Sequence, residues 1–161
     1  MTPRLAEVAG PGRDLGVVEV YHARFAVDTR SRIEWQDLTA PVGDAVHAVE
    51  ISDGMVLINS HHTTTAVLLA EFRPPVLAAL RDLIERLVPD RGYRHDDPRV
   101  SDCERGNGSA HLRAALLGRS VALGVARGRL VLGPEQSIVL VELDGPRPRE
   151  ISVQVLGWAR A

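Results

Sequence analysis

Two adjacent histidines, His61 and His62, stand in a polar stretch at residues 59–65, between two short apolar blocks typical of buried strands. Imidazole can ligate a metal ion or transfer a proton near neutral pH, so histidines held at the edge of a sheet could do chemistry. In an extended segment, neighbouring side chains point to opposite faces. The spacing therefore predicts that only one of the two imidazoles enters any one pocket.

Two further histidines lie in separate segments, His95 in a long polar loop and His111 at the start of a short helix. Three imidazoles from three segments could converge on one ion such as zinc. No close-spaced pattern such as HExxH is present. Each histidine could equally hydrogen-bond backbone at the end of a strand or helix, so spacing alone leaves both interpretations open.

Charged side chains supply the other candidates. Glu71 ends the second apolar block and needs a partner if it faces inward, whereas Asp82 lies on a mixed-charge helix face that is usually hydrated. Either carboxylate could be a ligand or a general base. Arg147 and Arg149 are two residues apart, so in extended backbone both point the same way and could bind phosphate, or simply protect a sheet edge. The threonines at 63–65 add hydroxyls, although threonine is an ordinary strand residue.

The residues around Cys103 and around the Gly-rich segment at 106–108 favour neither a nucleophile nor a phosphate loop. Cys103 lies between Asp102 and Glu104, whose charges disfavour the thiolate, so it is not expected to be a nucleophile. The Gly-rich segment at 106–108 has no Lys-Ser/Thr after it and resembles a phosphate loop only superficially.

The elements that must position these residues follow from hydrophobic periodicity. The pattern predicts helices at 40–50, 76–88 and 110–117, and strands at 17–29, 33–35, 55–60, 66–72, 121–123, 129–132, 138–143 and 151–156. Thr39 is expected to cap the first helix, and Gly118 to end the third in a left-handed conformation. This order predicts an α+β domain with a largely antiparallel sheet.

The connections between these elements carry turn signals. Asp53-Gly54 is expected to precede a strand, Arg127-Gly128 to form a hairpin turn and Asp144-Gly145-Pro146 to form another. The connection at 90–109 is much longer than the usual length of about 4 to 6 residues, and loops of this kind tend to be functional or disordered.

Composition limits the function classes. The 161 residues fit a single domain, and residues 1–15 are expected to be a poorly ordered tail. A formal charge of -2 and only six aromatic residues argue against nucleic acid and an anionic membrane as partners. One cysteine excludes an intrachain disulfide and no apolar signal core is present, so a cytoplasmic location is expected.

Several motifs in one order resemble the YjbQ family, long described as uncharacterised and associated with a secondary thiamine-phosphate synthase activity. They are His62-Thr63-Thr64, Glu71, Tyr93-x-His95, Asn107-x-x-Ala110-His111-Leu112, Gly128-Arg129-Leu130-x-Leu132-Gly133, Gln136 and Asp144-Gly145-Pro146-Arg147-x-Arg149. The likeness runs from about Val17 to Gly157. Two positions depart from the family pattern: Glu135 stands where the family has Trp, and Ala70 where it has Asn.

The resemblance implies a homotrimer of small α+β subunits, with a divalent metal, Mg or Zn, in at least some relatives. Carried over by position, the metal ligands are His62, His95 and His111, and the catalytic residues are His62, His95, Asn107 and Glu71. The phosphate-binding residues are Thr63, Thr64, Gln136, Arg147 and Arg149. The new acid at Glu135 could alter a pocket wall or repel an anionic substrate.

The implied reaction joins a pyrimidinylmethyl diphosphate to a thiazole phosphate and releases pyrophosphate. Cations are needed around the departing diphosphate, where negative charge accumulates, and a divalent ion with Arg147 and Arg149 could supply them. Two alternatives remain open: a metal-dependent hydrolase in which a His-ligated ion activates water, and a non-catalytic trimer that binds a small molecule. The expected partners are a phosphorylated small molecule and other copies of the chain.

Overall fold

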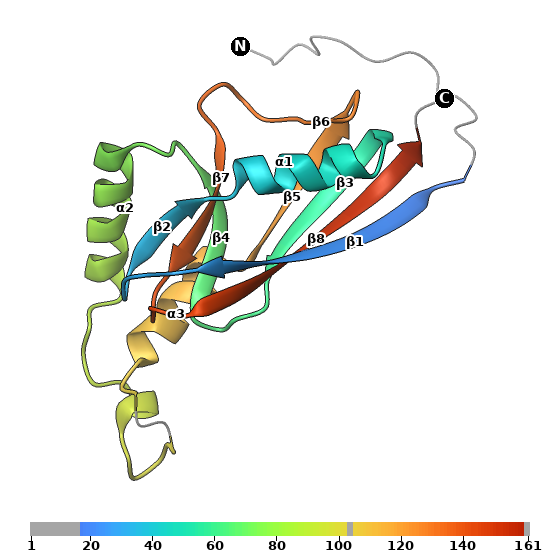
Figure 1. Ribbon diagram of the computed structural model, residues 1–161. Helices are drawn as coiled ribbons and strands as arrows, with labels where there is room; N and C mark the ends of the chain where they lie inside the picture. The colour runs from blue at the N-terminus through green and yellow to red at the C-terminus, as the bar shows by residue number, and fades with distance from the viewer. Residues whose placement is uncertain (1–16, 103–104, 160–161) are drawn as a thin grey trace, which may run out of the picture.

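The computed structural model describes residues 17–102 and 105–159, so the expectations for residues 1–15 and for Cys103 lie outside the described residues. The elements in chain order are β1 (Glu19–Asp28), β2 (Glu34–Asp37), α1 (Thr39–Ala48), β3 (Ile51–Ser60), β4 (Thr65–Ala70), α2 (Pro74–Leu87), a 3-10 turn η1 (Arg94–Asp96), α3 (Gly108–Leu117), β5 (Ser120–Ala126), β6 (Arg129–Leu130), β7 (Ser137–Glu142) and β8 (Pro148–Ala159) (Figure 1). None of the helices in these described ranges is both long and apolar enough to cross a membrane.

The strands form two sheets, in the orders β1-β8-β3-β5-β6 and β2-β7-β4, and every pairing is antiparallel. This confirms the predicted α+β class. The second turn prediction was wrong, because β7 and β8 belong to different sheets. The Gly145 N–H donates a hydrogen bond to the carbonyl of Arg32. The segment between β7 and β8 is thus fixed to the β1–β2 connection, and it carries the chain from one sheet to the other.

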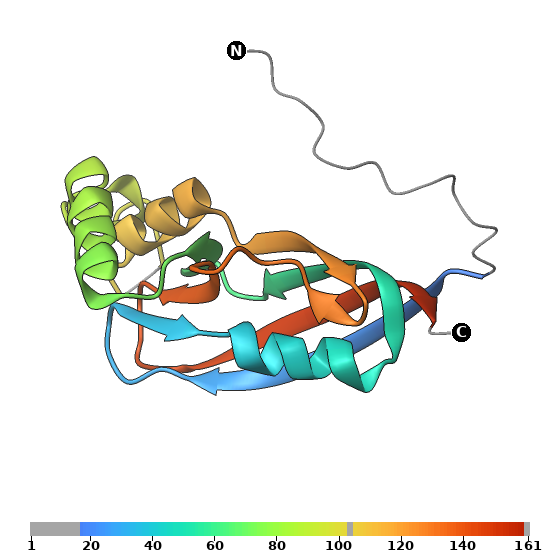
Figure 2. The same cartoon turned by 90° about the horizontal axis from the view of Figure 1, so that it is seen from above.

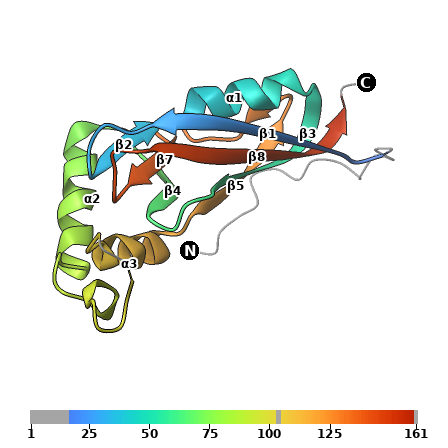
Figure 3. The same cartoon turned by 60° about the horizontal axis from the view of Figure 1, so that its bottom comes forward.

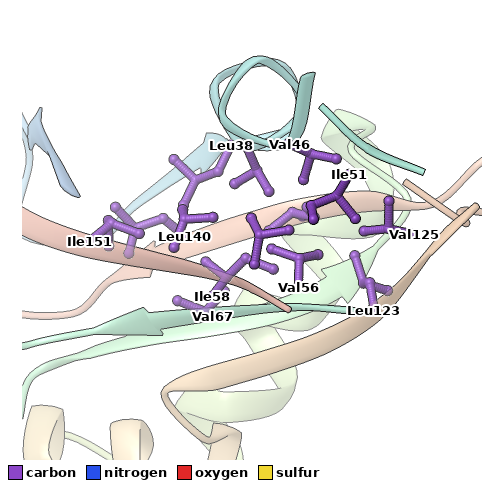
Figure 4. Packing of buried hydrophobic residues seen from close by; sticks show 14 residues of the cluster. Leu38, Val46, Ile51, Val56, Ile58, Val67, Leu123, Val125, Leu140 and Ile151 are labelled. Carbon is purple, nitrogen blue, oxygen red and sulfur yellow. The ribbon is translucent and has the colours of Figure 1, made fainter. Parts of the chain in front are cut away.

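The three-stranded sheet lies between two apolar cores. One core packs its Val67 and Leu140 against α1 and the inner face of the five-stranded sheet (Figure 4). In the other core, the opposite face of the three-stranded sheet, including Ala66 and Val141, packs against Ile84 of α2 and against α3. Figures 2 and 3 show α1 over the five-stranded sheet, with α2 and α3 together at the other end of the molecule. A strand buried on both faces explains why β7 is an unbroken apolar run instead of an alternating one.

The start of α1 differs from the prediction. The N-cap is Leu38, and the Thr39 hydroxyl accepts the Ile138 N–H at 2.9 Å instead of capping the helix. The Asp37 carboxylate accepts the Thr39 N–H at 2.8 Å. Thr39 therefore ties the helix to β7, a contact 99 residues away that local sequence could not indicate.

Asp53-Gly54 does not precede a strand but lies inside β3, where the register against β8 shifts between Ile51 and Asp53. Gly54 pairs with Gly157. A Cβ at Gly54 would lie 2.0 Å from the Leu156 carbonyl oxygen, so glycine is required by the close approach of two strands and not by a turn.

The first hairpin prediction is confirmed. Ala126 pairs with Arg129, and the two residues between them, Arg127 and Gly128, have φ of 53° and 71°, as a two-residue hairpin turn needs. Gly118 has the expected positive φ of 84°, but its ψ of 157° lies outside the left-handed helical region. The chain therefore leaves α3 extended and runs directly into β5.

Candidate functional site

A groove of about 360 Å³ lies between the β3–β4 connection and α3. The residues that can contribute polar groups or shape to it are His62, Thr63, Thr65, His111, Gly118 and Arg119. Two predicted site histidines and a predicted phosphate-binding threonine thus share one hollow. The end of β3 is fixed to the start of β4, because the buried Ser60 and Thr65 hydroxyls bond each other across the connection.

His62 is held in one orientation by backbone. Its Nε2 accepts the N–H of Glu150 at 2.7 Å, so the neutral ring carries its proton on Nδ1. Burial, followed by the positive charge of Arg149, lowers the pKa of His62 below its usual 6.5. At pH 7 the ring is therefore a neutral hydrogen-bond donor. His61 lines a different hollow, next to His22 and Leu57, and its Nδ1 lies 3.8 Å from the Glu150 carboxylate. The prediction that the two imidazoles enter different pockets is confirmed.

His95 and His111 are neighbours although they belong to separate segments. Their ring centroids are 4.6 Å apart with the planes tilted by 40°. Burial, and then the nearby His95, lower the pKa of His111. Asp96 makes the contact possible, because its carboxylate accepts the N–H of Gly108 at 2.7 Å and that of Tyr93 at 3.1 Å, which fastens the long loop to the start of α3.

The three histidines do not assemble as a metal centre in one chain. Across residues 17–102 and 105–159, no three His, Cys, Asp or Glu side chains are grouped so that one ion could be held by all of them. His62 already uses Nε2 to accept the Glu150 N–H. His95 keeps a buried Nδ1 with no hydrogen-bond partner, 3.5 Å from the Asp96 carboxylate, which leaves His95 and His111 as the pair able to offer ligands together. Within one chain the described residues therefore do not fit a metal held by all three histidines. The expected divalent metal stays a prediction.

Arg149 is not placed to bind phosphate. Its guanidinium is buried and forms two hydrogen bonds of 2.5 Å to the carboxylate of Glu142, which is also buried. A further N–H reaches the Thr64 hydroxyl at 3.1 Å. The expected pairing of Arg149 with Arg147 on one anion therefore does not form, and Thr64 supports Arg149 instead of a ligand.

Asn107 and Arg147 meet at the buried carboxylate of Asp144. Its Oδ2 accepts hydrogen bonds from Asn107 at 2.8 Å, from Arg147 at 3.1 Å and from Arg105 at 3.2 Å. The Asn107 amide nitrogen is thus used to hold Asp144. Arg147 remains a third exposed, so it keeps access to solvent near the same end of the sheets.

Glu71 and Gln136 lie at the opposite end of β4 from His62. Ala70 pairs with Ser137, so Glu71 and Gln136 both stand just beyond that end of the sheet. The length of β4 separates them from the groove by roughly 20 Å. Glu71 pairs with Arg73 at 2.8 Å, and Gln136 accepts the Gly133 N–H at 2.9 Å. The single chain therefore does not bring these two predicted residues to the histidines.

The two departures from the family pattern and Asp82 also lie away from the groove. Glu135 binds Arg73 at 3.2 Å beside Glu71, and Ala70 is the last residue of β4. Asp82 is exposed on α2, as a hydrated helix face predicts. The acid gained at Glu135 consequently does not repel an anion from the His62 groove of its own chain.

Arg119 is the groove residue that sequence reasoning missed. Its side chain is exposed, and no hydrogen bond or ion pair engages it within the part of the chain that the structure describes. The Arg119 carbonyl accepts the Ser60 N–H at 2.9 Å, which fixes its backbone against β3. The available signal was a cation directly after the glycine that ends α3.

Most of the chain matches a known protein family. The profile of the family described as "UPF0047 protein YjbQ-like" matches residues 23–158. A UPF0047 protein of Archaeoglobus fulgidus is 41% identical over 133 residues, covering 82% of this chain and 98% of that protein. The UPF0047 protein YugU of Bacillus subtilis is 30% identical over 131 residues, covering 81% and 96%.

Solved structures show the same fold. A YbjQ-like protein of unknown function from Sulfolobus solfataricus superposes with a TM-score of 0.80 at 34% identity, covering 87% of this chain and 99% of that one. An uncharacterised protein of the yjbq/upf0047 family from Clostridium acetobutylicum gives a TM-score of 0.74 at 29% identity, covering 83% and 98%. On sequence and on structure alike, the chain belongs to the YjbQ (UPF0047) family.

Proposed function

We propose that the groove between the β3–β4 connection and α3 binds a phosphorylated small molecule, and that the protein is a transferase of the thiamine-phosphate synthase type. The observation that carries the proposal is that Arg119, whose guanidinium has no partner among the described residues, lines the same groove as the exposed Thr63 and as His62, whose Nδ1 carries the ring proton. One cation and two neutral donors around a hollow of this size suit the oxygens of a phosphate or diphosphate.

The roles follow from the chemistry of each group. In the proposed reaction the bond between the pyrimidinylmethyl carbon and the diphosphate oxygen breaks, pyrophosphate leaves with the electron pair, and the thiazole nitrogen forms the new bond to carbon. Arg119 opposes the charge that builds on the leaving diphosphate. His62 Nδ1 and the Thr63 hydroxyl donate to its oxygens. A divalent ion bound to the diphosphate would offset part of its charge, and no step depends on an ion held by the three histidines.

The test is an assay of pyrophosphate release with both substrates and Mg²⁺. Arg119→Met should lower kcat/KM by roughly 10- to 100-fold, the loss expected for a charge-assisted hydrogen bond. Arg86→Met removes the same charge from an exposed position of α2 outside the groove and should leave the rate unchanged. Wild-type turnover no higher than a protein-free blank would end the transferase assignment, and equal rates for Arg119→Met and wild type would end the assignment to this groove.

Measurements on the same samples also test the alternative functions. Saturable binding of pyrophosphate without turnover would indicate a non-catalytic binding protein. A hydrolase with a His-ligated ion has less support, because the described residues bring no three ligands together. The proposal goes with a cytoplasmic location, which the single cysteine favours.

A further inference from the structure

A second hollow, of about 520 Å³, lies on the other side of α3. Its walls come from the β1–β2 connection, α2, the start of the long loop and α3, with Ser31, Arg32, Arg81, Glu85, Asp90 and Arg113 among the lining residues. We call it the Arg113 cleft. His111 and Arg113 are two positions apart on α3 and so are separated by roughly 200° around the helix, which places the cleft and the groove on different sides.

The charges of the cleft leave one cation without a counter-charge. Arg32 pairs with Asp90 at 3.3 Å, and Arg81 pairs with Glu85 at 2.9 Å. Arg113 is only 3% exposed, and its Nε donates to the carbonyl of Val88 at 2.9 Å. Among the described residues no carboxylate forms an ion pair with Arg113, and no other acceptor engages its two terminal nitrogens.

A guanidinium on a side chain that is buried over most of its length, with no counter-charge, is costly, and it is retained most readily where a ligand supplies the missing charge. The planar end of arginine offers two parallel N–H groups, the geometry that binds phosphate or carboxylate through two oxygens. The side of the cleft formed by α3 is fixed to the long loop, because Asp90 also accepts the Ser109 hydroxyl at 2.6 Å. The cleft thus has a fixed donor and a surplus of one positive charge.

We propose that the Arg113 cleft is a second ligand site, which binds the phosphate or carboxylate group of a small molecule through Arg113. The competing explanation is that the Arg113 stem packs in the protein while its end is merely hydrated. The two differ in one measurable respect, because only a ligand site gives saturable anion binding that depends on Arg113.

The experiment titrates inorganic phosphate, and separately acetate, into protein carrying Arg119→Met, so that the groove has lost its cation. Arg113→Met keeps the apolar stem, and it should weaken binding at least about tenfold relative to the Arg119→Met parent. Arg86→Met, which removes an exposed charge from α2 outside the cleft, should change the dissociation constant less than about twofold. The tighter of the two anions identifies the ligand class. No binding of either anion to the parent, or equal binding by Arg113→Met, overturns the proposal.

A gain-of-binding variant covers the case in which Arg113→Met does not fold. Glu85→Gln frees Arg81 inside the cleft and should tighten anion binding by roughly two- to fivefold. Asp82→Asn makes the same change in net charge at an exposed position of α2 that does not line the cleft. Equal tightening by both variants would show a general charge effect and would overturn the site.

Discussion

The ion pair between Glu142 and Arg149 explains why the motif residues Arg149 and Thr64 stabilise the fold instead of binding a ligand. The Glu142 carboxylate also accepts the backbone N–H groups of Leu143 and Asp144 and the hydroxyl of Thr29. These bonds join the end of β7, the start of β8 and the end of β1 at the point where the two sheets meet. A charge of this kind is tolerated only while its partner is present.

Arg149→Met should therefore lower the free energy of unfolding by about 3 to 5 kcal/mol, because it leaves the buried Glu142 carboxylate without a counter-charge. The double variant Glu142→Gln with Arg149→Met removes that charge and should regain at least half of the loss. Urea unfolding measures both. A loss below about 1 kcal/mol for the single variant would mean that the pair contributes little to the stability of the fold and that Arg149 could bind phosphate instead.

The Glu34 carboxylate makes the stability of the protein depend on pH. The Glu34 carboxylate accepts the Arg30 N–H at 2.5 Å, the Ser31 N–H at 3.0 Å and the Gln36 side chain at 2.7 Å. Burial alone would raise the pKa of Glu34, but these bonds outweigh it and hold the pKa below 4.5. The charged form is thus favoured in the folded protein, so its contribution is full above pH 4.5 and is lost as the pH falls through the folded pKa.

Glu34→Gln tests this directly. The difference in unfolding free energy between wild type and the variant should stay constant above about pH 5 and shrink steadily below pH 4.5. Urea unfolding at a series of pH values gives that difference. A gap that is unchanged down to about pH 3.5 would show that the carboxylate charge does not hold the β1–β2 connection.

At the scale of elements, the passage from α3 into β5 depends on one residue. Gly118 has φ of 84° and ψ of 157°, a conformation almost confined to glycine, and an added Cβ would meet open space. Gly118→Ala should therefore cost about 1 to 3 kcal/mol of unfolding free energy through backbone strain alone, and it should weaken anion binding by displacing Arg119.

Gly92→Ala is the matched control, because a Cβ there also meets nothing within 4 Å and Gly92 is not among the described glycines with positive φ. It should change the unfolding free energy by less than about 0.5 kcal/mol. If the two alanine variants have the same stability, the conformation of Gly118 is not what ends α3.

Local patterns predicted most elements but not how they meet. The period of α2, the positive φ at Arg127-Gly128 and the opposite directions of His61 and His62 depend on neighbouring residues, and each prediction is confirmed. Gly54 was misinterpreted because the close approach of Gly157 comes from a strand more than a hundred residues away. The assignment of β7 and β8 to separate sheets depends likewise on contacts with Arg32 that no local signal carries.

The candidate site shows the same limit. Motif order marked His62 and His111, and the structure brings both to one groove, but the contact of His95 with His111 depends on how Asp96 fastens the loop to α3. The family resemblance implied that Arg149 binds phosphate and that Asn107 is catalytic. Only the structure shows that a buried carboxylate occupies each of them.

At the scale of the whole molecule, the five-stranded sheet has one face that no described element covers. Both α1 and the three-stranded sheet pack on its inner face. The outer face carries Val20 and Met55, each paired with Leu156 of β8, together with Leu57. These apolar side chains are 39 to 49% exposed, and contiguous apolar surface of this kind marks an interaction site.

We expect the homotrimer implied by the family resemblance to use this face, and such an assembly could bring the Glu71 end of one chain to the groove of another. Light scattering should then give three times the chain mass of 17.5 kDa. Leu57→Glu places a charge in the contact and should shift the protein to single chains, because an unpaired buried carboxylate is costly. Leu87→Glu alters an equally apolar and more exposed position on α2 and should leave the mass unchanged. A Leu57→Glu mass equal to wild type would remove this face as the contact. A wild-type mass of one chain would leave Glu71 and Gln136 outside the site.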